Sequence, residues 1–288
     1  MSLFGINNEG ILIGTEAVRG IKPRVELGGA VIVVVGLAFE ARIAAGPGMK
    51  VICGGNGQNL AATISRAITH DCKGLISFGV AGGLAPELKP GACIVASAVM
   101  MGNSRLPTDD RWSQRLLRTI PNVIHGMLLG VPAPVSDPAD KRALYIKTGA
   151  IAVDMESHIV AKLAAARGLP MAAIRVVTDP AMHAIPNTAL AAVRSNGTID
   201  VGAAVCSLLK KPRDLVELVQ LALDARTARA TLHQSRRLLG PGLGLPEFRG
   251  GDIALNDMRN LNRNWRARGT NAGFGSFAAT TRALQSAD

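Results

Sequence analysis

Between residues 28 and 210 the chain alternates short, almost wholly apolar runs with stretches of helical spacing. The apolar runs are rich in β-branched residues and are bounded by glycine or polar residues, which is typical of buried strands. They are AVIVVVG (30–36), KVICGG (50–55), GLISFG (74–79), ACIVAS (92–97), GAIAVD (149–154) and MAAIRVV (171–177). Helical spacing covers 59–71 and 157–169, and Gly168 and Pro170 form a stop signal for the second helix. Continuous apolar strands separated by helices predict an α/β fold with a mixed, mainly parallel central sheet flanked by helices.

The rest of the chain is organised around this single domain, which we assign to residues 28–211. Residues 1–27 show no clear period and are expected to be a partly irregular lead-in. Residues 212–240 have the apolar spacing of an amphipathic helix and end in basic residues. Residues 241–288 hold few apolar anchors, so we expect a largely disordered tail.

The charge balance narrows the range of partners. The formal net charge is +11, and residues 210–288 contribute thirteen Lys and Arg against seven Asp and Glu. Such a basic region can meet nucleic acid, an anionic membrane surface or only water. Nucleic acid is not expected, because no stacking aromatics accompany the early basic residues and no nucleic-acid motif is present.

The chain also lacks the signals of a membrane span or a metal site. No run reaches the roughly 18 consecutive apolar residues of a membrane-spanning helix. The four cysteines are scattered, without metal-ligand spacing, and fit reduced core thiols. We therefore expect a cytoplasmic protein without metal or cofactor, with peripheral contact to the inner membrane surface as a hypothesis.

Polar residues collect where the predicted strands end. Ligands of α/β sheets bind beyond the carboxyl ends of the strands. The residues that follow the runs are Glu40 and Arg42, the glycine turn with Gly55 and Gly57, the GVAGG turn, Met155 and Glu156, and Thr178 and Asp179. Simpler interpretations exist: the glutamates can be helix-start acids, the glycines tight turns, and Asp179 a turn initiator before Pro180. Their shared position nevertheless predicts one site.

The chemistry of such a site follows from its residue types. It would hold carboxylates and glycine turns, without a nucleophilic Ser–His pair, a metal cluster or a phosphate-binding lysine motif. This set suits cleavage of a glycosidic bond through a cation-like sugar. One carboxylic acid then protonates the leaving group, while others bind the sugar hydroxyls and the incoming nucleophile.

Three blocks resemble the purine nucleoside phosphorylase and nucleosidase superfamily. They are GLISFGVAGGLAPELKPGACIVAS (74–97), AVDMESHIVAKLAAARGLP (152–170) and IRVVTDPA (174–181), and they occur in the family's order. The segment GGNGQNLAA (54–62) occupies the place of the family's early glycine-rich segment. The resemblance spans roughly 30–210 and implies a nucleoside phosphorylase-like fold.

Further segments are most similar to the hopanoid-associated phosphorylase group of that superfamily. They are PTDDRW (107–112), GVPAPVSDPADK (130–141) and SRRLLG (235–240). The similarity implies release of adenine from adenosylhopane during hopanoid synthesis. It also implies a substrate with an apolar 5′ group, phosphate or water as the second reactant, and a homo-oligomer.

The resemblance assigns roles to individual residues. Asp179 matches the general acid that shares a proton with N7 of the purine. Glu156 matches the glutamate that binds the ribose 2′ and 3′ hydroxyls, and Met155 would pack against the sugar. The purine and nucleophile region would be lined by Val80, Ala81, Gly82 and Thr178. The turn at 136–139 lacks the aromatic residue that often stacks on the purine.

Two departures from the family favour hydrolysis over phosphorolysis. Phosphorylases of the superfamily bind phosphate with an arginine four residues after the first strand's glycine, and counting from Gly36 that place holds Glu40. Adenosine-type nucleosidases carry a glutamate in this loop, where it positions water. The second phosphate arginine is replaced by Ser77 and Phe78. Residues that could still bind phosphate are Gly36, Arg42, Gly55, Gly57 and Arg175.

Two rival interpretations stay open. The substrate can instead be methylthioadenosine, S-adenosylhomocysteine or another purine nucleoside. The chain can also be a non-catalytic scaffold that binds a nucleoside. Asp179 and Glu156 argue against the scaffold, because a protein that only binds needs no proton donor at N7.

Overall fold

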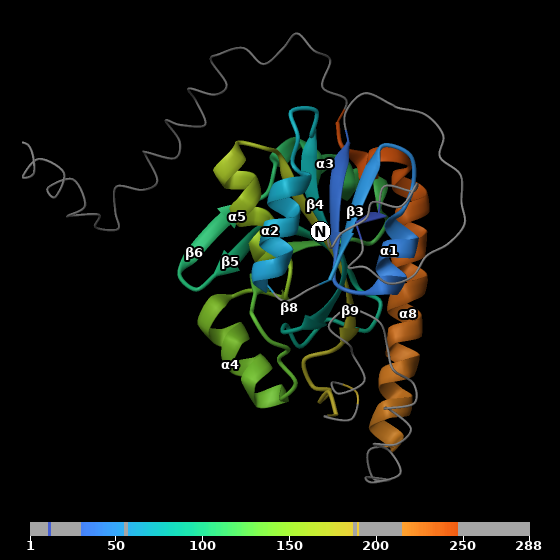
Figure 1. The fold of residues 1–288 in the computed structure, drawn as a ribbon. Helices are drawn as coiled ribbons and strands as arrows, with labels where there is room; N and C mark the ends of the chain where they lie inside the picture. The colour runs from blue at the N-terminus through green and yellow to red at the C-terminus, as the bar shows by residue number, and fades with distance from the viewer. Residues whose placement is uncertain (1–10, 13–29, 55–56, 187–188, 190–214, 247–288) are drawn as a thin grey trace, which may run out of the picture. The chain divides into compact units, whose positions relative to one another are not determined.

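A computed structural model of the protein describes residues 11–12, 30–54, 57–186, 189 and 215–246 (Figure 1). All of them belong to one compact unit, Met1–Pro246. The expectations for the lead-in and for the tail fall almost entirely outside the described residues.

The described part of the chain forms a sheet and its covering helices. The strands are β1 (Ile11–Leu12), β2 (Val31–Val35), β3 (Met49–Cys53), β4 (Gly74–Gly83), β5 (Cys93–Met101), β6 (Ser104–Pro107), β7 (Ile124–Gly130), β8 (Ala152–Asp154) and β9 (Met171–Asp179). The helices are α1 (Ala38–Ala44), α2 (Gly57–Ala67), α3 (Asp110–Thr119), α4 (Pro138–Thr148), α5 (Ser157–Arg167) and α8 (Leu215–Leu239), followed by the 3₁₀ turn η2 (Pro241–Gly244).

The strands form a single nine-stranded sheet in the order β1-β3-β2-β4-β8-β7-β5-β6, with β9 paired to both β4 and β5. Six of the pairings are parallel, and three are antiparallel: β4 with β8, β5 with β6, and β5 with β9. The mixed, mainly parallel α/β sheet predicted from the apolar runs is therefore confirmed.

Strand β2 shows why both faces of the sheet are covered. Its five residues are all buried, and successive side chains of a strand point to opposite faces. Val31, Val33 and Val35 pack in one apolar cluster with α1, α3 and α8. Ile32 and Val34 pack in a second cluster with α2 and α5. Figure 1 shows α1 and α8 on one side of the sheet and α2 and α5 on the other.

Helix α8 belongs to the core of this unit. Ala228 and Leu232 are fully buried in the cluster on the α1 face of the sheet. Arg236 donates to the carbonyl oxygens of Ala44 and Ala45 at 3.2 Å each, and so satisfies the C-terminal end of α1. Within the described ranges, no helix combines the length and the apolar character that crossing a bilayer demands.

Candidate active site

The end of β4 is the centre of the site, because other strands meet it there. β4 runs parallel to β9, with Gly79 beside Arg175, and antiparallel to β8, with Gly82 beside Val153. Strand β2 pairs with the first half of β4 and leads through Gly36 into α1. The segments that follow β2, β8 and β9 therefore meet at the last residues of β4.

Glu40 lies in the first turn of α1 and is buried, with both carboxylate oxygens bonded to backbone. Oε2 accepts hydrogen bonds from the N–H groups of Gly36 and Leu37, at 2.8 Å each. Oε1 accepts one from the N–H of Val80 at 2.7 Å. Glu40 thus caps the start of its own helix and also fastens α1 to the end of β4.

Arg175 is fully buried in β9 and binds two carboxylates. Its Nε donates to Oδ2 of Asp154 at 2.7 Å, and its Nη2 donates to Oε2 of Glu156 at 3.1 Å. Nη2 also donates to the hydroxyls of Ser77 and Ser157, at 2.6 and 3.3 Å. The group formed by Glu40, Asp154, Glu156 and Arg175 is named the carboxylate–arginine cluster.

Asp154 has structural partners besides the arginine. Its Oδ1 accepts hydrogen bonds from the N–H groups of Glu156 and Ser157, at 3.1 and 2.8 Å, and its Oδ2 accepts one from the hydroxyl of Ser157. These bonds satisfy the free N–H groups at the start of α5. Asp154 therefore fixes both the guanidinium of Arg175 and the backbone of Glu156.

Two glycines leave room for the cluster. A Cβ atom on Gly79 would lie 2.5 Å from Oε1 of Glu40 and 2.6 Å from Nη1 of Arg175. A Cβ atom on Gly36 would lie 2.7 Å from Oε1 of Glu156. Among the described residues, Nη1 of Arg175 has no hydrogen-bond partner. Nη1 is thus a buried N–H donor without a partner, and it lies beside Glu40 at the position of Gly79.

Burial dominates the electrostatics of the cluster. The pKa of Glu156 is raised to about 7, chiefly by burial. The positive charge of Arg175 opposes this rise, and the negative charges of Asp154 and Glu40 add to it. Burial also raises the pKa of Glu40, against the lowering effect of Arg175 and of the backbone hydrogen bonds. The pKa of Arg175 is raised, because the three carboxylates outweigh the effect of its burial. The arginine is therefore always charged, whereas Glu156 exchanges a proton near neutral pH.

Asp179 ends β9 and is buried, and its two oxygens have different partners. Oδ2 accepts a hydrogen bond from Nζ of Lys141 at 2.8 Å. Oδ1 accepts one from the hydroxyl of Thr178 at 2.7 Å, and that hydroxyl also lies 3.3 Å from the carbonyl oxygen of Ala81. A Cβ atom on Gly82 would lie 2.9 Å from Oδ2. Asp179 therefore faces the end of β4 from the side of β9.

The structure brings most of the predicted site residues together. Those that belong to the cluster, or that contact it, Asp179 or Thr178, are Gly36, Glu40, Val80, Ala81, Gly82, Glu156, Arg175 and Thr178. Met155 follows β8 beside Glu156 and is 38% exposed. Arg42 lies apart, on the exposed side of α1. Gly57 begins α2, and Gly55 lies outside the described residues.

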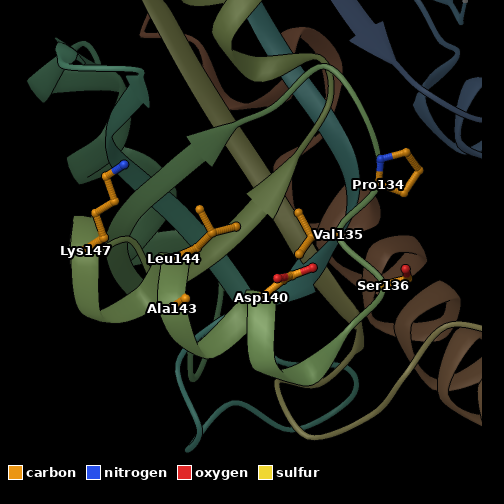
Figure 2. A pocket seen from close by; sticks show the side chains of 7 residues that line it. All are labelled: Pro134, Val135, Ser136, Asp140, Ala143, Leu144 and Lys147. Carbon is orange, nitrogen blue, oxygen red and sulfur yellow. The ribbon is translucent and has the colours of Figure 1, made fainter.

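A hollow of about 440 Å³ lies beside α4 (Figure 2). Its lining residues are Pro134, Val135, Ser136, Asp140, Ala143, Leu144 and Lys147. None of the site residues predicted from the sequence contributes to it. This hollow is therefore distinct from the carboxylate–arginine cluster.

The sequence interpretation missed Lys141 and the serines that bind Arg175. Lys141 stands in a segment, GVPAPVSDPADK, that was assigned only by resemblance. Its one signal in the sequence is a lysine in the first turn of a helix, where a cation is disfavoured by the helix dipole. Neither serine has a local signal for its contact with Arg175, because the arginine lies 98 residues from Ser77 and 18 residues from Ser157.

Comparison with known families decides the classification. The family described as the Phosphorylase superfamily matches residues 24–210, which include the whole cluster and Asp179. The chain belongs to the Phosphorylase superfamily. It is accordingly an enzyme of the kind that cleaves nucleosides at the N-glycosidic bond.

Solved structures of similar fold include several enzymes that act on nucleosides. Futalosine hydrolase of Helicobacter pylori strain 26695 is 16% identical, with a TM-score of 0.47, over 54% of this chain and 86% of that chain. The 5′-methylthioadenosine/S-adenosylhomocysteine nucleosidase of Campylobacter jejuni is 14% identical, with a TM-score of 0.49, over 72% of this chain and 100% of that chain.

A putative 5′-methylthioadenosine/S-adenosylhomocysteine nucleosidase of Borrelia burgdorferi B31, bound to adenine, is 14% identical, with a TM-score of 0.48, over 69% of this chain and 98% of that chain. These identities are too low to transfer a substrate. A search of curated proteins gave no match.

Proposed function

We propose that the protein hydrolyses the N-glycosidic bond of adenosylhopane, releasing adenine. Water would attack C1′ of the ribose, the bond from C1′ to the purine would break, and the sugar would leave as a ribosyl hopane. In this balance the purine gains a proton at N7 as its bond to C1′ breaks, and the attacking water loses a proton, for which Glu40 is the proposed acceptor.

Asp179 is the proposed general acid. Its carboxyl group would give a proton to N7 of the purine as the glycosidic bond breaks, so that adenine leaves as a neutral base. The position of Asp179 supports this role, since it is buried at the carboxyl end of β9, facing the end of β4. Ligands of α/β sheets bind at such strand ends.

Glu156 is the proposed ribose ligand. An ionised carboxylate accepts hydrogen bonds from two vicinal hydroxyls, and its negative charge stabilises a sugar on which positive charge develops. Arg175 and the backbone bond to Asp154 hold Glu156 in place. Met155 lies next to it, partly exposed, where it could contact the sugar face.

One observation carries the choice of water over phosphate: the cluster contains three carboxylates and only one arginine. The single arginine is already bonded to the carboxylates of Asp154 and Glu156, so the cluster has no surplus positive charge. A phosphate dianion needs such a surplus to replace its hydration, whereas a neutral water molecule does not. A water molecule would accept from Nη1 of Arg175 and donate to Glu40, because both groups lie on the same side of Gly79.

The substrate assignment is tested by adenine release. Purified protein is incubated with adenosylhopane, methylthioadenosine or S-adenosylhomocysteine, each with and without phosphate, and adenine is quantified by chromatography. We expect the fastest release from adenosylhopane, at a rate independent of phosphate. Faster release from either sulfur nucleoside would replace the proposed substrate, and absence of release from adenosylhopane would refute it.

The proposal includes peripheral membrane contact, because adenosylhopane carries a long apolar 5′ group. Val219 and Leu223 of α8 support it, since both are about half exposed on one helix face. Flotation with anionic liposomes tests it with the pair Val219→Asp and Leu223→Asp. Unchanged flotation of the doubly substituted protein would refute the contact. Point substitutions are used for this test in place of a deletion of residues 212–288, because such a deletion would remove core residues of α8.

We also propose a homo-oligomer, from the family resemblance. Light scattering coupled to size-exclusion chromatography measures the mass directly. A monomer at micromolar concentration would refute this part of the proposal.

A further inference from the structure

Lys141 is an unusual residue at its place in the fold. It is fully buried, and it is the only buried residue of α4. It stands in the first turn of that helix, where the helix dipole disfavours a positive charge. Lysine is almost never fully buried without a partner, because removing an ammonium group from water is costly.

The partners of Lys141 all come from the segment at the end of β9. Nζ donates to Oδ2 of Asp179 at 2.8 Å and lies 3.3 Å from the Asp179 carbonyl oxygen. It also donates to the carbonyl oxygens of Pro180 at 3.0 Å and His183 at 2.9 Å. One ammonium group thus binds the carboxylate of Asp179 and the backbone on both sides of the turn that follows it.

These bonds leave the two oxygens of Asp179 in different states. Oδ2 accepts from an ammonium group that is also bonded to two backbone carbonyl oxygens, whereas Oδ1 is bonded only to the hydroxyl of Thr178. That hydroxyl has an alternative acceptor, the carbonyl oxygen of Ala81 at 3.3 Å. A hydroxyl can rotate between two acceptors, so Oδ1 is the oxygen that can be released to a ligand.

Helix α8 braces the same segment from the other side. The ring of His183 bonds through Nδ1 to Oδ2 of the buried Asp224 at 3.1 Å, and Gln220 donates to the other oxygen of Asp224 at 2.8 Å. The segment 179–183 is therefore held by α4 through Lys141 and by α8 through Asp224.

Stability alone does not account for Lys141. Replacing a buried ion pair by apolar residues of similar size is often neutral or stabilising, so a helix that needed only to pack would be served by an apolar side chain. The presence of a lysine here is better explained by its hydrogen bond to the carboxylate of Asp179.

We propose that Lys141 is a positioning residue for Asp179: it fixes Oδ2, orients Oδ1 toward the purine, and balances the negative charge that Asp179 acquires when its proton passes to the leaving base. This inference rests on the proposed role of Asp179 as the general acid. The proton that moves sits on Oδ1 of Asp179 before the reaction, once the Thr178 hydroxyl has turned to the carbonyl oxygen of Ala81, and it ends on the base. No proton moves from Lys141.

The test is a double-mutant cycle with full-length protein, measured as adenine release from whichever nucleoside the wild-type enzyme cleaves fastest. The variants are Lys141→Met, Asp179→Asn and the double substitution, with Lys147→Met on the exposed part of α4 as the matched control.

We expect Lys141→Met to lower kcat by about 100-fold with KM changed by less than about threefold, because a general acid contributes about that much or more. In the Asp179→Asn background the same substitution should lower kcat by less than about threefold, since the group it orients is already lost.

An equal loss of kcat in both backgrounds would overturn the inference, as would a loss confined to KM or the same kcat in Lys141→Met and Lys147→Met. Circular dichroism and urea unfolding check that each variant is folded. If Lys141→Met does not fold, Lys141→Arg runs the same cycle, because it keeps the charge but displaces the donor. Its kcat should then fall only where Asp179 is present. Absence of cleavage by the wild type would instead refute the proposed function, a different result.

Discussion

Arg175 is the residue whose removal should change stability most sharply with pH. Its guanidinium makes four hydrogen bonds and neutralises two carboxylates directly, with a third nearby. Substitution of Arg175 by Met keeps most of the apolar volume and removes the charge. Breaking a buried ion network by removing one partner costs about 3–5 kcal/mol in the free energy of unfolding.

The pH dependence of this loss follows from the carboxylates that remain. Burial already raises the pKa of Glu156 from 4.5 to about 7, so in the wild type its contribution to stability is present below pH 4.5 and is lost as the pH rises through about 7. Burial raises the pKa of Glu40 too, so its contribution has the same sign. Without Arg175 these pKa values rise further. The loss in Arg175→Met should therefore be about 3–5 kcal/mol at pH 8 and about half of that at pH 5, where Glu156 is protonated and leaves no unpaired charge.

Urea unfolding followed by circular dichroism at pH 5, 6.5 and 8 measures this difference. The control is Arg167→Met on α5, because Arg167 is exposed and donates one hydrogen bond, to Ser65 at 2.8 Å. We expect the control to change the free energy of unfolding by less than about 0.5 kcal/mol at every pH. A loss for Arg175→Met that is equal at pH 5 and pH 8, or as small as that of the control, would refute the account of the cluster.

Two further predictions concern catalysis. Asp179→Asn should lower kcat for adenine release by about 100-fold to 10,000-fold, since the amide cannot protonate N7, and a rate within tenfold of the wild type would refute its role as the acid. The ratio kcat/KM should rise with pH through about 7 as Glu156 ionises to accept the ribose hydroxyls, because its pKa is raised to about 7. Glu156→Gln should lack that rise; a variant profile parallel to the wild-type profile would assign the titration to another group.

The strands could be predicted from the sequence because their residues carry the signal themselves. A run such as AVIVVVG is apolar on both faces, so burial in a covered sheet is its only stable outcome. Shorter or more polar elements gave no such signal. Helix α1 has seven residues, too few to establish a helical period, and the first residues of β7 are exposed.

The site could be predicted only in part, for a related reason. Ligands of α/β sheets bind at the carboxyl ends of strands. Glu40, Glu156 and Asp179 all lie in the segments that follow predicted strands. The pairings among charged groups depend on the register between distant segments. Lys141 meets Asp179 across 38 residues and Arg175 meets Ser77 across 98, so no local pattern reports either contact.

The central claim is that water is the nucleophile, and isotopic labelling tests it most directly. The enzyme is incubated with its adenine nucleoside in oxygen-18 water, with and without phosphate, and the sugar is reduced at once to stop anomeric exchange. Mass spectrometry then locates the label. The account predicts a sugar carrying oxygen-18 at C1′ and an adenine release rate independent of phosphate. A ribosyl 1-phosphate product without the label, formed at a rate that rises with phosphate concentration, would contradict it.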